Sequence, residues 1–279
     1  MLGEPIIPGC NTMKNLRSVL PLLLVVMLVA LLFIPGLASA SVNATFSRSS
    51  SAFYSNGTWV SPSTGRFDTI VGQPGLLIEE GITNYWPANV ANGGEDGTTT
   101  GFATLNGARV SSDTSQYYNG THSIKVITCA TLANSQAYVT RSVSSNAVYT
   151  ISLYLKGTSG SEAVSMIASD NAGLLTTRNV TLTTGWQRYS FNFTTNAGAG
   201  TLTFKLGSAN ATGMTFYADS LQIENSWATT TWYQGGSVRA ADVLTIPTAG
   251  VINPNNCTIS QWLYVDNNTK DTHVSRDLF

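Results

Sequence analysis

From about residue 124 onward, apolar and polar side chains alternate along the chain, and this alternation limits the folds that the chain can adopt. Residues 149–155 are apolar at every odd position, and residues 202–206 are apolar at every even position. A period of two is the period of a β-strand with one buried face. No window after residue 40 has a helical i, i+3, i+4, i+7 apolar stripe over three turns. The pattern therefore predicts an all-β fold, built as an antiparallel sandwich.

The composition restricts the function as well as the fold. A chain of 279 residues with 43% apolar residues can bury a sizeable core. Charged residues make up only 10%, with 14 basic and 15 acidic side chains, and this balance excludes a basic nucleic-acid-binding protein. Two histidines and three cysteines leave little material for metal clusters or nucleophilic catalysis. We therefore expect a protein that acts by binding.

The first 40 residues have the three parts of a secretory signal peptide. Lys14 and Arg17 precede an apolar run over residues 19–34, and small residues end at Ala38 and Ala40. Cleavage after Ala40 would give a secreted, extracellular or cell-surface protein. The alternative is an uncleaved anchor helix, because a run of about 16 apolar residues approaches the length of a membrane span. Contact with a membrane is expected only through such an uncleaved segment.

Export would leave Cys129 and Cys257 in an oxidising compartment, where two cysteines can pair. Cys129 falls in an apolar strand pattern and Cys257 lies past the predicted domain, so we expect two buried free thiols. Eight N-x-S/T sequons follow the signal segment and permit glycosylation. They begin at Asn43, Asn56, Asn119, Asn179, Asn192, Asn210, Asn256 and Asn267.

The chain divides into five predicted parts. A signal peptide, 1–40, is followed by a Ser-rich segment, 41–84, and then by one β-sandwich, 85–225. A polar linker, 226–244, leads to an incomplete second β segment, 245–279, with apolar residues in alternation. An unpaired apolar strand invites edge-to-edge pairing. We therefore expect either that these residues are the first strands of a truncated domain, or that they pair with the sandwich or with another subunit.

Ordered motifs in the sandwich region resemble the CenC-type carbohydrate-binding modules of families 4 and 9. These modules open with N-G-x-F-E and G-W, followed by a G-x-x-S-L-K-V strand. The resemblance implies a jelly-roll, galactose-binding-like sandwich with a carbohydrate ligand. Its residues are Asn92–Gly97, Gly101–Phe102, Asn119–Val126, Tyr149–Gly157, Gly185–Phe191 and Tyr217–Glu224.

The same resemblance implies a structural calcium ion. In the family, oxygens of the opening acidic residue and of the aspartate of the last strand hold this ion, and the matching residues here are Glu95 and Asp219. Calcium takes six to eight oxygen ligands, so backbone carbonyls would complete the set. The alternative is that Asp219 caps a strand end and that Glu95 is a solvated turn residue.

The flanks resemble a second arrangement, found in phage and prophage structural proteins. There R-F-D, G-L-L-I-E-E and T-N precede a module of this type, and R-A-A-D follows it before a concanavalin-like laminin-G domain. The first strand of that domain resembles Thr258–Val265. The matching flank residues are Arg66–Asp68, Gly75–Glu80, Thr83–Asn84 and Arg239–Asp242.

Sugar recognition needs flat apolar surface for the C–H faces of the rings and polar groups for the hydroxyls. Six side chains lie on the predicted solvent side of three strands, and adjacent strands would bring them into one concave patch. The alternative is that the aromatic residues are ordinary packing and surface residues. The six are Gln136, Tyr138, Tyr154, Lys156, Trp186 and Arg188.

No catalytic constellation is recognisable. Glu79 and Glu80, and likewise Glu95 and Asp96, are neighbours in sequence, and neighbouring strand residues point to opposite faces. Neither pair is therefore typical of a glycosidase. We expect a chain that is not an enzyme.

Two functions from different classes remain. The first is a secreted, non-catalytic carbohydrate-binding protein that recognises a polysaccharide or cell-surface glycan. The second is a structural subunit of a virion, tail or cell-surface assembly that uses the sandwich as a packing block. The export signal favours the first, and the flanking motifs favour the second.

Overall fold

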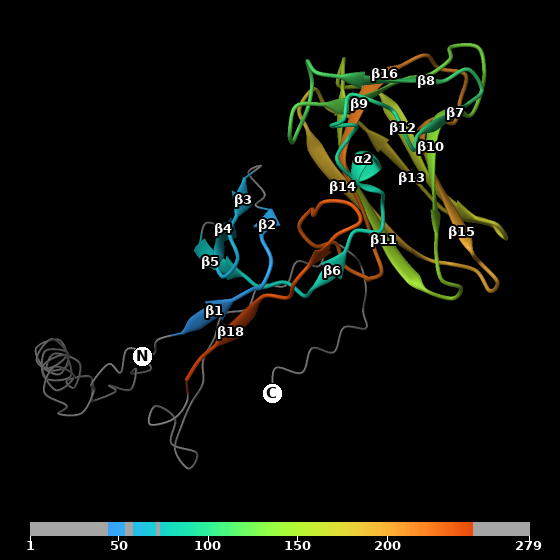
Figure 1. Ribbon diagram of the computed structural model, residues 1–279. Helices are drawn as coiled ribbons and strands as arrows, with labels where there is room; N and C mark the ends of the chain where they lie inside the picture. The colour runs from blue at the N-terminus through green and yellow to red at the C-terminus, as the bar shows by residue number, and fades with distance from the viewer. Residues whose placement is uncertain (1–43, 54–57, 71–72, 248–279) are drawn as a thin grey trace, which may run out of the picture. The chain divides into compact units, whose positions relative to one another are not determined.

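The computed structural model describes residues 44–53, 58–70 and 73–247, and two five-stranded antiparallel sheets dominate them (Figure 1). Sheet I has the strand order β13-β12-β15-β10-β7, and sheet II has the order β14-β11-β16-β9-β8. Their strands are β7 (Ala103–Leu105), β8 (Arg109–Asp113), β9 (Ser123–Ile127), β10 (Ser135–Ser142), β11 (Val148–Gly157), β12 (Ala163–Asp170), β13 (Gly173–Thr181), β14 (Gln187–Thr194), β15 (Thr201–Ser208) and β16 (Thr215–Glu224). The prediction of an all-β antiparallel sandwich is confirmed.

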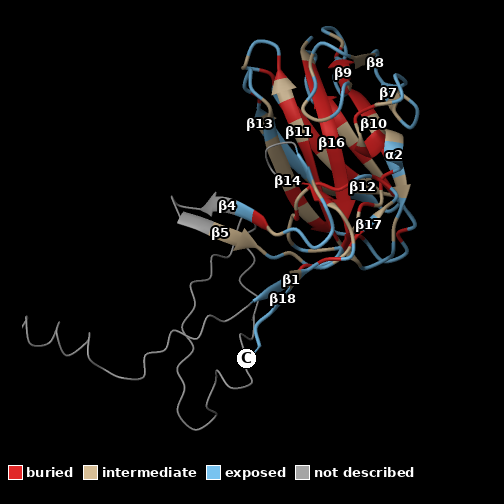
Figure 2. Cartoon of the chain, turned by 60° about the vertical axis from the view of Figure 1, so that its left-hand side comes forward, coloured by how far each residue is buried: buried red, intermediate tan, exposed pale blue. Residues whose placement is uncertain are grey.

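The apolar side chains of the alternating pattern form the core between the two sheets. Tyr149 and Leu153 on β11, Phe191 on β14 and Phe204 on β15 are all buried in one apolar cluster. Figure 2 shows the same concentration of buried residues in β11 and β16. Since each fully buried large apolar side chain contributes about 1.5–3 kcal/mol, this cluster is the main source of the sandwich's stability.

Shorter elements accompany the sandwich. Four ladders of two strands each form among the flanking residues, and one short helix, α2 (Ala88–Ala91), packs its Val90 and Ala91 into the core. The paired strands are β1 (Thr45–Ser47) with β18 (Val243–Thr245), β2 (Ala52–Phe53) with β3 (Trp59–Val60), β4 (Arg66–Ile70) with β5 (Gln73–Leu77), and β6 (Ile82–Thr83) with β17 (Val238–Arg239).

The flanking motifs meet in a buried ion-pair cluster. Asp242 accepts hydrogen bonds from Arg48 at 2.9 Å and from Arg66 at 2.6 Å. Glu79 lies 2.8 Å from Arg66 and 3.5 Å from Arg239. Four of these five residues belong to the motifs that resemble phage structural proteins, and here they hold the flanking segments together through ion pairs. The resemblance of the flanks stays a prediction.

The segment predicted as a linker, residues 226–244, packs against its neighbours. Trp232 and Tyr233 are buried, and Trp232 makes an edge-to-face contact with Phe53. Asn84 ties this segment to the sandwich, because its side-chain amide donates to the carbonyls of Leu221 and Tyr233. Aromatic residues in a polar stretch could have indicated this packing.

Several predictions lie outside the described residues: the signal segment, the incomplete C-terminal segment after Pro247, and Cys257. Among the described residues, no helix is long and apolar enough to cross a membrane. Cys129 was expected to be buried, but it follows the end of β9 and is half-buried and free.

Candidate functional site

The outer face of sheet II gathers four of the six predicted sugar-binding residues. Tyr154 lies opposite Arg188 in the β11–β14 ladder, and Lys156 follows Tyr154 two residues later on the same face of β11. Trp186 precedes β14 by one residue and has the same parity as Arg188. The apolar neighbours Leu153 and Leu155 are fully buried on the opposite face. Strand alternation therefore directs these four side chains away from the core.

Tyr118, which the sequence analysis missed, completes this surface. It lies in the loop between β8 and β9, and its ring stacks on Tyr154 with centroids 3.6 Å apart and planes 14° apart. Trp186 meets Tyr118 edge to face at 6.4 Å. We call Tyr118, Tyr154, Lys156, Trp186 and Arg188 the aromatic face. All five side chains are half-buried, so the rings are held in place and still reach solvent.

The two cations of the aromatic face have neutral partners. Arg188 donates to the Ser152 hydroxyl at 2.9 Å, and its guanidinium carbon lies 5.9 Å from the Tyr154 ring centre. Lys156 donates to the side-chain carbonyl of Gln116. Within the described ranges, neither cation forms an ion pair with a carboxylate. Both remain able to donate to the hydroxyl or carboxylate oxygens of a ligand.

Tyr118 is held as a neutral phenol. Burial raises its pKa, and a hydrogen bond with Tyr154 raises it further. A phenol that keeps its proton can both donate and accept, as can a sugar hydroxyl.

The other end of the same sheet face is covered by protein. Thr150 donates to the carbonyl of Ser226, and the side-chain amide of Asn192 donates to the carbonyl of Trp227. Further along, the backbone N–H of Tyr233 donates to the side chain of Gln222. The segment 226–233 therefore limits the open part of this face to the rows around Tyr154 and Lys156.

The structure does not bring Gln136 and Tyr138 to the aromatic face. Both lie on β10, which belongs to sheet I, and their parity directs them to the outside of that sheet. Gln136 is buried, and Tyr138 lies opposite Lys205. The single patch expected from six residues therefore divides between two sheets, because alternation along a strand does not say in which sheet the strand lies.

Glu95 and Asp219 were predicted as calcium ligands, and each forms the centre of a small network. The Glu95 carboxylate accepts hydrogen bonds from the backbone N–H groups of Thr121 and His122, both at 2.8 Å. Asp219 accepts from the backbone N–H groups of Tyr118 at 2.8 Å and Asn119 at 3.0 Å. One loop, residues 118–122, therefore contacts both carboxylates.

Two glycines allow these close contacts. Gly93 has a φ of 72°, and a Cβ there would lie 2.6 Å from Asp219 Oδ1. Gly120 has a φ of 73°, and a Cβ there would overlap the Glu95 carboxylate. A residue with a side chain would be strained at either position and would also push a carboxylate away.

The charge of Asp219 is poorly compensated. Burial raises its pKa to about 7, although the backbone N–H groups of Asn119, Tyr118 and Ser220 lower it, and the negative charge of Glu95 raises it. A cation would offset this repulsion, and carboxylate oxygens are the ligand type that calcium prefers. Glu95 and Asp219 therefore fit such an ion in charge and in atom type. No group of three or more His, Cys, Asp or Glu side chains that could hold a metal occurs among the residues described, so backbone carbonyls or water would supply the remaining ligands.

A family comparison covers most of the sandwich. Residues 88–212 match the CBM_4_9 family model, which is described as a carbohydrate binding domain. The matched range includes Tyr118, Tyr154, Trp186 and Glu95, and it ends before Asp219. The match supports a carbohydrate-binding module in this part of the chain. No curated protein matches the chain.

Three solved structures are similar to the chain in part. The CBM22-1 xylan-binding domain of Paenibacillus barcinonensis Xyn10C is 24% identical, over 48% of this chain and 92% of that domain, with a TM-score of 0.40. The CBM22-1-GH10 modules of Clostridium thermocellum Xyn10B, complexed with xylohexaose, are 18% identical over 48% of this chain and 28% of that chain, with a TM-score of 0.39. The enzymatically active domain of bacteriophage CBA120 tailspike protein 4 is 9% identical over 50% of this chain and 21% of that chain, with a TM-score of 0.38. At these identities and scores, the three structures do not indicate what this chain binds.

Proposed function

We propose that this chain is a secreted, non-catalytic carbohydrate-binding protein whose aromatic face binds a polysaccharide or cell-surface glycan. The observation that carries the proposal is the aromatic face itself. Three aromatic rings and two cations lie together on the outside of one sheet, and neither cation pairs with a carboxylate of the described residues. They lie within the part of the chain that matches a carbohydrate-binding family model.

The chemistry of the face suits a sugar chain. An aromatic ring offers a flat apolar surface to the C–H side of a pyranose, and Tyr, Arg and Lys side chains offer hydrogen bonds to its hydroxyls. The pairs Tyr118–Tyr154 and Tyr118–Trp186 hold the rings before a ligand arrives, which reduces the entropy lost on binding.

The test is a pull-down with insoluble polysaccharides, followed by calorimetry with soluble xylan and β-glucan. We expect binding to at least one polysaccharide and a roughly tenfold loss with Trp186→Ala, equivalent to about 1.4 kcal/mol. Tyr138→Ala is the matched control, because it removes an aromatic residue of similar exposure from the other sheet. Failure to bind any glycan, or equal losses in the two variants, would refute the proposal.

We also propose that Glu95 and Asp219 hold a structural calcium ion. The support is the raised pKa of Asp219, for which burial is the main cause and the Glu95 charge a further one. A bound cation would fix the loop that carries Tyr118 and would stabilise the sandwich. Thermal melting with added calcium and with a chelator tests this, since an unchanged midpoint would remove the site.

Export is proposed from the signal-like segment over residues 1–40. The support is sequence only: two basic residues, an apolar run and an A-x-A ending. Expression of the full chain in a secreting host, followed by N-terminal sequencing of the product in the medium, tests it. A first residue of Ser41 is the expected result, and retention of the full chain in cells would contradict it.

A further inference from the structure

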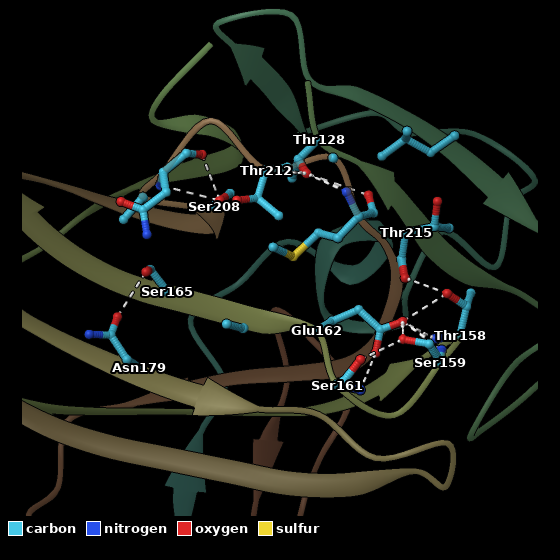
Figure 3. Close-up of a pocket in the computed structure, with 16 residues that line it drawn as sticks. Thr128, Thr158, Ser159, Ser161, Glu162, Ser165, Asn179, Ser208, Thr212 and Thr215 are labelled. Carbon is cyan, nitrogen blue, oxygen red and sulfur yellow. Dashed lines mark hydrogen bonds between the residues drawn. The ribbon is translucent and has the colours of Figure 1, made fainter. Parts of the chain in front are cut away.

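A second concave site lies at one end of the sandwich, apart from the aromatic face. It is a cavity of about 690 Å³ to which both sheets contribute (Figure 3). Sheet II supplies Ile127 and Thr215, and sheet I supplies Ser165, Asn179 and Ser208. The volume falls within the range of about 300–1,000 Å³ that is usual for small-molecule sites.

The lining of this end cavity is almost uncharged. Its polar groups are hydroxyls and side-chain amides, and the apolar side chains of Met214 and Ile127 form part of the wall. Among the described residues, no Lys, Arg or His lines the cavity, so none of them supplies a counter-charge for an anion. The hydroxyl and amide residues include Thr128, Thr158, Ser165, Asn179, Ser208 and Asn210.

The one carboxylate of the lining is already occupied by the protein. Glu162 accepts hydrogen bonds from four backbone N–H groups, those of residues 158–161, and from the hydroxyls of Thr158 and Ser159 (Figure 3). The Glu162 carboxylate is thus bound to N–H and hydroxyl groups of its own turn. Its role is to hold the rim formed by residues 158–161 in one conformation.

The same strands lead from the aromatic face to the end cavity. Thr158 follows the last residue of β11 and is two residues beyond Lys156, and alternate residues of an extended chain lie about 7 Å apart. On β16, Thr215 is likewise two residues from Tyr217, which lies opposite Lys156. A ligand that follows these strands past Lys156 reaches the rim of the cavity.

We propose that the end cavity is a second binding site, specific for a neutral saccharide. The hydroxyls of Thr128, Ser165 and Ser208 already donate to protein oxygens, so they would accept hydrogen bonds from sugar hydroxyls. The side-chain amides of Asn179 and Asn210 would donate to the sugar, and Met214 would pack on a C–H face of the ring. The site has no aromatic platform, so it binds one or two sugar units more weakly than the aromatic face binds a chain. This inference goes beyond the proposed function, because the site works without the aromatic face.

The test is NMR titration of the full chain, made in a host without N-glycosylation so that Asn179 and Asn210 stay unmodified. The probes are xylohexaose, cellohexaose and laminarihexaose, and the signals are the side-chain amides of Asn179 and Asn210. The background is the double variant Tyr154→Ala/Trp186→Ala, which removes the aromatic face. We expect at least one probe to shift both amide signals in this background.

Two exposed alanines give a matched pair of variants. Ala209 lines the cavity, and Ala211 is exposed close by but does not line it. Ala209→Trp should weaken the titration at least tenfold, and Ala211→Trp should change it less than twofold. The inference is overturned if no probe shifts the two signals, if the shifts need the aromatic face, or if both tryptophan variants act alike. Polysaccharide binding by the aromatic face would survive that result, so the two proposals fail separately.

Discussion

Two buried carboxylates, in two regions of the same sandwich, show opposite behaviour. Asp219 lies beneath the loop that carries Tyr118, and burial raises its pKa to about 7. Glu162 lies in the rim of the end cavity, where burial also acts to raise its pKa, but hydrogen bonds from Ser159 and Thr158 outweigh burial and hold the pKa at about 2. Both carboxylates accept hydrogen bonds from several backbone N–H groups.

The difference lies in solvation and in neighbouring charge. Asp219 is fully buried and faces the like charge of Glu95, and three backbone N–H groups do not compensate for this. Glu162 lies at an open rim, and its carboxylate accepts hydrogen bonds from four backbone N–H groups and two hydroxyls, which lower its pKa. We therefore expect an added cation to stabilise the Asp219 region more than the Glu162 region.

The largest expected effect is on the pH dependence of stability. Between pH 4 and 7, folded Asp219 holds a proton that it lacks when unfolded, so without calcium the free energy of unfolding falls as pH rises through this window. A pKa change of about 3 units corresponds to a fall on the order of 4 kcal/mol. Urea unfolding across this range, with a chelator present, measures it.

Asp219→Asn is the control for that measurement, since it removes the titrating group and should remove the slope that belongs to it. Saturating calcium should also remove the fall, because a calcium-bound carboxylate stays ionised. Suppose that, without calcium, the free energy of unfolding varies with pH in the same way for the wild type and for Asp219→Asn. The pKa of Asp219 would then not be raised, and the two carboxylates would not differ in the way described.

A smaller effect is expected for Glu162→Gln. The substitution replaces an anion with a neutral amide in front of four backbone N–H groups, and we expect a loss of about 2 kcal/mol in the free energy of unfolding. In the wild type this stabilisation is complete above about pH 4.5 and disappears as pH falls toward 2. Chemical unfolding at pH 7 and pH 3 tests both statements, with Ser161→Ala as the control. An acid-insensitive difference would show that Glu162 acts by packing alone.

The smallest effect concerns ligand binding. Asp219 accepts the backbone N–H groups of Tyr118 and Asn119 and so positions the ring that stacks on Tyr154. Above pH 7, where the Asp219 carboxylate is ionised, Asp219→Asn should weaken polysaccharide binding about fivefold, or about 1 kcal/mol, because the charge-assisted hydrogen bonds to these two N–H groups become neutral. Glu162→Gln should change the same affinity less than twofold. Calorimetry with a polysaccharide that the wild type binds measures both affinities. Equal affinities for the two variants would show that Asp219 does not position Tyr118 for binding.

The sandwich was predictable because its signal is local. Alternation in β11 identifies Leu153 as buried and Tyr154 as exposed without knowledge of any other strand. The composition of the aromatic face depends instead on pairing between strands far apart in sequence. Tyr138 and Tyr154 have equivalent patterns, and only the strand order places them on different sheets.

The parts that sequence reasoning missed come from loops. Tyr118 has no periodic neighbours, and its only signal is a Tyr-Tyr-Asn-Gly run before β9. Glu162 is a single acidic residue in a Ser-rich turn, and its role depends on N–H groups that converge only when the turn forms. The flank motifs around Arg66 and Asp242 were noticed, but their ion pairs join residues 176 positions apart.

The pairing of β1 with β18 determines how the molecule would respond to tension. Thr45 lies opposite Thr245, so the chain enters and leaves the described unit at one place. A pulling force applied through the segments on either side would unzip three residue pairs and then load the contact between Arg48 and Asp242. Sheets I and II would carry none of that load until the β1–β18 pairing and the Arg48–Asp242 contact had both broken.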